Sequence, residues 1–146
     1  MKVKCVTKKH ITDTVPCFIK PYSVPKNIDY FVTFSFGTGV DGGVEYPLFV
    51  GAEYTVYGIM VHDHIMYYLI SYEEACPPDW IPSSLFQVSD CSIPYFWVFQ
   101  NGFKENDEIL FIISHYEIAT DFCHMLGVLQ GYSSDDKKFR KAMSEY

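Results

Sequence analysis

Basic side chains are almost absent from residues 27–136 of this 146-residue sequence, which hold sixteen Asp and Glu residues and a single basic one, Lys104. The two ends carry net charges of +5 over residues 1–26 and +3 over residues 137–146, against −15 for the block between them. Binding to a phosphate backbone requires a basic surface. The charge pattern therefore argues against nucleic-acid binding and favours a basic partner, because opposite charges speed the encounter of two proteins.

Long apolar runs are also missing. No segment approaches the ~18–20 apolar residues that a membrane-spanning helix needs, and residues 1–9 lack the apolar stretch of a signal peptide. We therefore expect a cytosolic protein that does not enter the membrane. The length is typical of a single domain, which we expect to extend over residues 1–146.

Paired cysteines are the third absence. Cys5, Cys17, Cys76, Cys91 and Cys123 include no C-x-x-C pair, whereas disulfide frameworks and zinc ribbons show short, paired spacings. We expect reduced thiols that pack as small hydrophobic groups. The sequence predicts neither a disulfide nor a bound cofactor.

Most of the chain has the composition of β-strands. β-Branched and aromatic residues predict strands at 2–7, 28–36, 54–61, 65–72, 95–99 and 109–113, with shorter ones at 44–50 and at the end of 80–88. Residues 62–64 are expected to connect two of them as a hairpin. Residues 54–61 and 65–72 are apolar on both faces, which predicts that both faces of the sheet are covered.

The C-terminal part is expected to be helical. Ser114 and Glu117 form an S-x-x-E capping box, and Gly131 is placed to end the first helix. Ser133 is expected to cap a second helix, whose buried side would be Phe139, Met143 and Tyr146. Strands followed by helices predict an α+β fold, a mostly antiparallel sheet with two C-terminal helices.

Four segments resemble small SH3-like barrels of bacterial and phage accessory proteins. They are Met1-Lys-Val-Lys-Cys-Val, Gly51-Ala-Glu-Tyr-Thr-Val-Tyr-Gly-Ile, Tyr67-Tyr-Leu-Ile and Trp80-Ile-Pro-Ser-Ser-Leu-Phe-Gln-Val. The resemblance, over residues 1–6 and 51–89, implies an SH3-like barrel, partly open because of the inserted segment and the C-terminal extension. In size and acidity the chain resembles the immunity proteins of bacterial toxin systems.

Three motifs could carry chemistry. His62 and His64 with Asp63 could begin a metal site, but zinc needs three or four converging ligands and no further spacing supplies them. We interpret this motif as an exposed polar turn. Cys123 beside a histidine could act as a nucleophile, and we interpret it as core packing. The glycine-rich segment 37–43 lacks the Lys-Ser/Thr of a phosphate-binding loop and is interpreted as a turn.

Acidic loops that alternate with aromatic side chains suggest a protein-binding surface, because aromatic residues form the buried anchors of interfaces. The predicted partner-binding residues are Tyr72, Glu73, Glu74, Asp79, Trp80, Asp90, Glu105, Asp107 and Glu108. The alternative is that the acidity only keeps an aromatic-rich domain in solution.

Three functional hypotheses follow. The first is a non-enzymatic cytosolic protein that neutralises a basic partner, as an immunity protein does for a toxin nuclease. The second is a structural adaptor of a phage or mobile element, built on an SH3-like barrel. The third is a small metal-dependent hydrolase that uses His62, His64 and a carboxylate.

Overall fold

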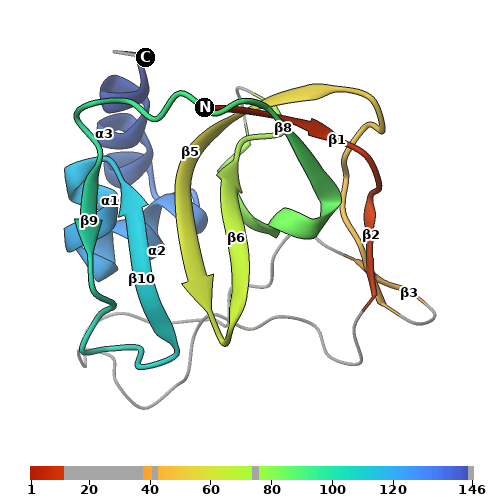
Figure 1. Cartoon of the computed structure of the whole chain (residues 1–146). Coiled ribbons are helices and arrows are strands. Elements are labelled where there is room, and N and C mark those ends of the chain that lie inside the picture. Colours follow the sequence, from red (N-terminus) through yellow and green to blue (C-terminus); the bar gives the residue numbers. More distant parts are fainter. Residues whose placement is uncertain (12–37, 41–42, 74–75, 145–146) are drawn as a thin grey trace.

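The computed structural model describes residues 1–11, 38–40, 43–73 and 76–144. Seven strands form one sheet, and in each described pairing the strands are antiparallel. Three helices follow in the C-terminal part of the described chain and lie behind one end of the sheet in Figure 1. The predicted α+β fold is confirmed.

The elements have the following bounds. The strands are β1 (Lys2–Cys5), β2 (Lys9–Ile11), β3 (Thr38–Val40), β4 (Gly43–Glu45), β5 (Glu53–His62), β6 (Ile65–Ile70), β7 (Asp79–Pro82), β8 (Phe86–Asp90), β9 (Val98–Gln100) and β10 (Ile109–Ser114). The helices are α1 (Tyr116–Thr120), α2 (Phe122–Leu129) and α3 (Ser133–Met143), and a 3-10 turn, η1, covers Ser83–Leu85.

Strand β5 is the centre of the sheet. One of its edges pairs with β6 from Val56 to His62, and β6 in turn pairs with β7. The other edge pairs with β1 over Glu53–Thr55 and then with β10 over Gly58–His62. The sheet therefore splits into a β1–β8 wing and a β10–β9 wing, and among the described strands it stays open rather than closing into a barrel. Strands β2, β4 and β3 form a separate small sheet.

Alternate side chains of the central strands enter two separate cores. Met60, Leu69 and Trp80 pack with the residues of the helices. Ile59 and Ile81 face the other way and pack with side chains of the β1 wing and of the small sheet. The prediction that both faces are covered is confirmed for these positions, and each fully buried large side chain contributes about 1.5–3 kcal/mol to the stability of the fold.

The hairpin between β5 and β6 is a two-residue turn. Asp63 and His64 have φ angles of 45° and 64°, and a type I′ turn needs positive φ at both central residues. The predicted hairpin is confirmed, and Asp is one of the residues that tolerate this conformation.

The first predicted helix starts later than predicted and is divided into two helices. Ser114 ends β10, and its hydroxyl donates a hydrogen bond to the Tyr57 carbonyl oxygen at 2.7 Å instead of capping a helix. The chain then forms α1 and α2, separated by Asp121 in an extended conformation. Asp121 accepts a hydrogen bond from the His124 N–H at 2.9 Å. A new N-cap in mid-sequence therefore divides the helix in two.

The predicted end of the first helix is confirmed, whereas the predicted cap of the second is wrong. Gly131 has φ 71° and, with Tyr132, forms the two backbone hydrogen bonds of a Schellman motif to Val128 and Gly127, which confirms the predicted end of α2. The predicted cap at Ser133 is wrong, because Tyr132 is the N-cap residue of α3 and makes no side-chain capping bond.

Several other predictions need correction or lie outside the described residues. Residues 80–82 belong to β7 rather than to a turn, and β9 is shorter than the predicted strand at 95–99, because the Trp97 N–H closes a turn onto the Pro94 carbonyl. Cys91 is exposed, whereas buried thiols were expected, and the four described cysteines form no disulfide. Residues 28–36, Cys17, Glu74 and Tyr146 lie outside the described residues.

Candidate functional site

Four apolar side chains lie side by side across the β9–β10–β5–β6 end of the sheet, on the face opposite the helices. Phe111 pairs with Val61, and Val61 pairs with Met66 on the next strand. The Phe99 ring stacks on the Phe111 ring, with ring centroids 5.7 Å apart and an angle of 29° between the planes. We call Phe99, Phe111, Val61 and Met66 the apolar row.

The apolar row is accessible to solvent. Phe99 is 59% exposed and Met66 is 42% exposed, and Phe111 and Val61 are half-buried. The neighbouring Ile59 and Ile113, on the same face, already belong to or pack against the core on the β1 side. Contiguous exposed apolar side chains, as opposed to scattered ones, mark interaction surfaces.

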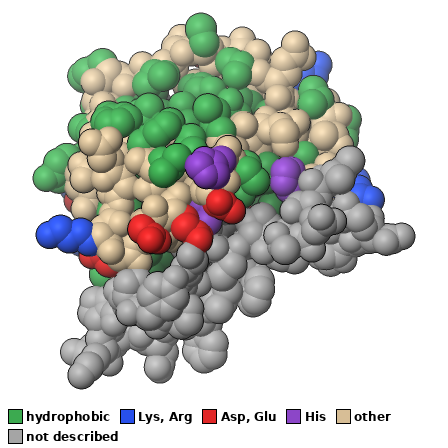
Figure 2. Space-filling model, turned by 60° about the horizontal axis from the view of Figure 1, so that its bottom comes forward, with side chains coloured by type: hydrophobic (Ala, Val, Ile, Leu, Met, Phe, Trp, Pro, Cys, Tyr) green, Lys and Arg blue, Asp and Glu red, His purple; other side chains and the backbone are tan. Residues whose placement is uncertain are grey.

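Carboxylates border the apolar row at one end of the sheet. The Asp63 N–H donates to the Glu108 carbonyl oxygen at 3.0 Å, so the β5–β6 turn lies against the loop before β10. Asn106, which is buried, fixes that loop by accepting a hydrogen bond from the Glu108 N–H at 3.0 Å. We call Asp63, Glu105, Asp107 and Glu108 the acidic edge. Figure 2 brings this end forward and shows acidic side chains beside an apolar area.

His62 lies behind the acidic edge. Its Nε2 is 3.3 Å from the Glu108 Oε2, and its side chain is only 6% exposed. The ring meets Tyr67 edge to face. Burial, with a smaller effect of the Asp63 charge, raises the pKa of Tyr67 to about 12. The predicted exposed turn is therefore wrong for His62 and correct for Asp63 and His64. Among the described residues no group of three or more His, Cys, Asp and Glu side chains could hold a metal ion.

Two of the predicted partner-binding residues are not on the surface. Trp80 is 0% exposed and Asp79 is 5% exposed. The reason is that β7 directs the indole ring into the core beneath the helices, so the prediction of Trp80 as a surface anchor is wrong. Asp79 accepts a hydrogen bond from the Tyr72 hydroxyl at 3.4 Å. Burial, together with the Asp79 charge, raises the pKa of Tyr72.

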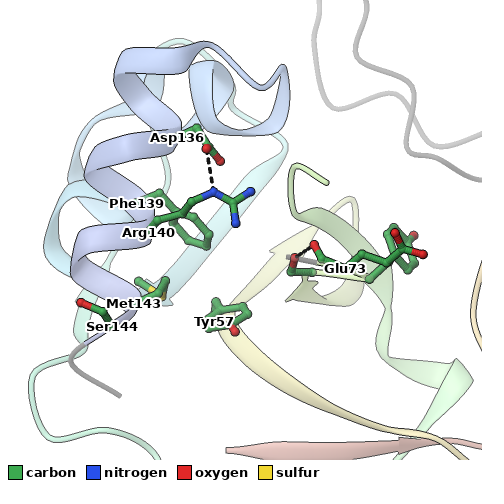
Figure 3. Close-up of a pocket in the computed structure, with 9 residues that line it drawn as sticks. Tyr57, Glu73, Asp136, Phe139, Arg140, Met143 and Ser144 are labelled. Atoms are coloured by element: carbon green, nitrogen blue, oxygen red, sulfur yellow. Dashed lines mark hydrogen bonds and ion pairs between the residues drawn. The ribbon is translucent and has the colours of Figure 1, made fainter. Parts of the chain in front are cut away.

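Tyr72 and Glu73 line an open pocket of about 780 Å³ between the end of β6 and α3 (Figure 3). The Arg140 Nε donates to the Asp136 Oδ2 at 2.6 Å on one side of this pocket. The Tyr57 and Phe139 rings meet edge to face, 5.7 Å apart. The remaining lining residues are Ser71, Met143 and Ser144. Charges of both signs line this pocket, so it does not continue the acidic edge.

Asp90 lies apart from both of these places, at the end of β8. Hydrogen bonds from Ser92 lower the pKa of the Asp90 carboxyl. Nearby, Glu53 forms an ion pair with Lys2 at 3.2 Å and accepts a hydrogen bond from Ser89 at 2.8 Å. The structure therefore divides the described residues of the predicted surface into three places. Tyr72, Glu73 and Asp79 lie near the end of β6, Asp90 lies on β8, and Glu105, Asp107 and Glu108 lie in the loop before β10.

A histidine–aspartate pair connects α2 with α3. The His124 Nδ1 is 2.7 Å from the Asp135 Oδ1, and the histidine side chain is 5% exposed. On the other side, the His124 Nε2 is 3.9 Å from the Glu117 Oε2. His115, the N-cap residue of α1, lies on a different helix from His124, which belongs to α2. The pair is placed to hold the helices together.

Comparison with protein-family models, with curated proteins and with solved structures gives no match for this chain. The resemblances to SH3-like barrels and to immunity proteins stay predictions. Among the described helices, none is both long enough and apolar enough to cross a membrane.

The sequence prediction missed the apolar row and Asp63. The signal for the row was present in residues 109–113, which are five consecutive apolar residues. A strand presents alternate side chains to opposite faces, so half of the side chains in such a run are buried only if another part of the protein covers the second face of the sheet. Phe111 lies on that second face and is only half-buried.

Proposed function

We propose that this chain is a non-enzymatic binding protein that captures a basic protein partner with the apolar row and the acidic edge. We further propose that the partner is the nuclease domain of a bacterial toxin, so that the chain acts as an immunity protein. The observation that carries the proposal is that the turn with Asp63 and the loop with Asp107 and Glu108 meet at the end of the strands that carry the exposed Phe99–Phe111 stack.

The two parts of this surface have different roles. Exposed aromatic and thioether side chains such as Phe99 and Met66 are the residue types that act as desolvated anchors in interfaces. Carboxylates at the border raise the rate of association with a basic partner and contribute less to the final affinity. Binding through this surface should therefore weaken with rising salt, mainly because association becomes slower.

A nuclease fits the charge of this surface. An enzyme that acts on a phosphate backbone must present basic side chains along its substrate cleft. The acidic edge is complementary to such a cleft, and the apolar row beside it supplies contact area. Occupying the cleft would block the nucleic acid without any chemistry by the bound protein.

The test is growth rescue in cells that express the protein encoded by the gene immediately upstream of this one. Co-expression of the wild-type chain should restore growth, and the Phe99→Ala variant should restore it poorly. Phe49→Ala is the matched control, because Phe49 is also exposed, at 75%, but lies outside the apolar row. Equal rescue by both variants would contradict the proposed surface, and no rescue by the wild type would contradict the proposed function.

A further inference from the structure

Strand β9 is a three-residue edge of the main sheet that carries no charge and no proline. Among the described strands it pairs with β10 alone, and it stands at the outer edge of the sheet in Figure 1. Its sequence is Val98-Phe99-Gln100. Proteins usually protect edge strands by keeping them short or with charges, prolines, bulges or covering segments, because unpaired backbone groups attract another strand.

The other two edges of this sheet carry such protection. Strand β7 contains Pro82, and its four residues are buried. Strand β8 ends in Asp90, and the Ser89 hydroxyl donates to Glu53 beside it. Among the edges of the main sheet that the structure describes, β9 is therefore the one protected by its short length alone.

Pairing in the sheet fixes the direction of the Phe99 backbone groups. Successive strand residues direct their N–H and C=O groups alternately to the two edges of a strand. The Asp63 N–H bonds to the Glu108 carbonyl, so the backbone groups of Asp63 point toward β10. Ile59 is an even number of positions before Asp63, so its N–H and C=O point toward β10 as well. Ile113, opposite Ile59, bonds toward β5. Phe99, opposite Ile113, therefore directs its N–H and C=O away from β10.

We propose that the partner adds a β-strand to β9 and binds the N–H and C=O of Phe99 with its own backbone. This inference rests on the proposed function and adds the mode of binding and the chemistry of the bound segment. Alternate side chains of the added strand would lie on the face of the apolar row and should be apolar. Lysine or arginine should follow at the end of the strand that lies next to Asp107 and Glu108.

Charge favours a basic partner over a second copy of this chain. Two copies that paired β9 with β9 around a twofold axis would run antiparallel. The acidic edge of each copy would then lie against residues 94–97 of the other, which carry no charge. Both copies also have a net charge of −7. In such a dimer the carboxylates of the acidic edge would contact no basic side chain, whereas the basic strand of a partner supplies one.

The experiment separates the backbone of Phe99 from its side chain. Phe99→Ala removes the ring and keeps the N–H, and Phe99→Pro removes both. Proline is tolerated on an edge strand where the N–H faces outward, so pairing with β10 should persist. The probe is the purified protein encoded immediately upstream, and the measurements are its dissociation constant and the exchange rate of the Phe99 amide proton in the wild-type complex.

We expect Phe99→Pro to weaken binding by roughly two- to tenfold beyond Phe99→Ala, since the hydrogen bond from the Phe99 N–H is lost, and the Phe99 amide to exchange more slowly in the complex. Equal affinities of the two variants, with an unprotected amide in the wild-type complex, would overturn strand addition and leave the proposed function standing. Dimerisation of the wild type that Phe99→Pro abolishes would assign the edge to a second copy and overturn the proposal. Failure of the wild type to bind the probe would contradict the proposed function itself.

Discussion

The stacked rings of Phe99 and Phe111 join β9 to β10 on the face of the sheet opposite the helices, with centroids 5.7 Å apart. Within a core such a pair would be ordinary, but here the Phe99 ring is more than half exposed. The exposed pair continues into Val61 and Met66 and ends at the acidic edge. A surface of this kind costs solubility if it has no use, which is why we connect it with binding.

The first prediction concerns the stability of Phe99→Ala. The substitution removes one aromatic contact, about 0.5–1.5 kcal/mol, and little buried area, because the ring is 59% exposed. We expect the free energy of unfolding to fall by about 1 kcal/mol or less, as measured by urea denaturation. A loss of several kcal/mol would mean that Phe99 is a core residue and unsuitable as a probe of binding.

The second prediction concerns the charge of the acidic edge. Asp107→Lys reverses an exposed charge beside the apolar row, so association with a basic partner should slow several-fold at low salt while dissociation changes little. Stopped-flow kinetics at two salt concentrations measures both rates. Asp90→Lys is the matched control, since Asp90 is also exposed but lies on β8. An equal effect of both substitutions would show that only net charge matters.

The third prediction concerns the contact between α2 and α3. A Cβ atom added at Gly127 would collide with the Asp135 carboxylate, which holds the His124 Nδ1. Gly127→Ala should therefore destabilise the fold by about 1–3 kcal/mol, as overpacking does, although alanine is the better helix former. Chemical denaturation measures this, with the exposed Ser134→Ala as the control. An unchanged or raised stability of Gly127→Ala would contradict the described packing.

The fourth prediction concerns the break between α1 and α2. Asp121 accepts a hydrogen bond from the His124 N–H at 2.9 Å as the N-cap of α2. Asp121→Ala should lower the free energy of unfolding by about 0.5–2 kcal/mol, and Asp121→Asn should restore most of it. Thermal unfolding followed by circular dichroism compares the two variants, and equal melting temperatures for alanine and asparagine would exclude the cap.

The fifth prediction concerns alkaline pH. Burial raises the pKa of Tyr67 from its usual value near 10 to about 12, so the folded state holds the phenol proton more tightly than the unfolded state does. The stabilisation is complete below pH ~10 and is lost as the pH rises toward ~12. Absorbance titration should show one tyrosine ionising near pH 12 that is missing in Tyr67→Phe, whereas a normal titration of all tyrosines would contradict its burial.

Much of the fold could be predicted, because its signals are local. Alternating and β-branched residues marked β5 and β6, the five-residue apolar run marked β10, and Gly131 marked the end of α2. The start of the helical part and the helix break at Asp121 could not be predicted. Ser114 has the residue type of an N-cap, but its hydroxyl bonds to Tyr57, which is distant in the sequence. Long-range contacts of this kind override local propensity.

The candidate site was harder to predict, because it depends on which face of each strand meets a core. Glu105, Asp107 and Glu108 were found from charge and loop position. Trp80 was misplaced, because it directly follows Asp79 and was grouped with the acidic loops, while its strand turns the indole ring inward. Phe99 and Met66 were overlooked because no local pattern distinguishes an apolar residue beneath a helix from one on the open face.

The most direct test of the proposed surface is the affinity of the protein encoded upstream for the wild-type chain, Phe99→Ala and Phe49→Ala, measured by calorimetry. The exposed Phe49 ring outside the row provides the matched comparison. We expect Phe99→Ala to weaken binding by roughly tenfold or more, as truncation of an interface anchor does, and Phe49→Ala to bind like the wild type. Wild-type affinity of Phe99→Ala, or an equal loss in both variants, would contradict the account.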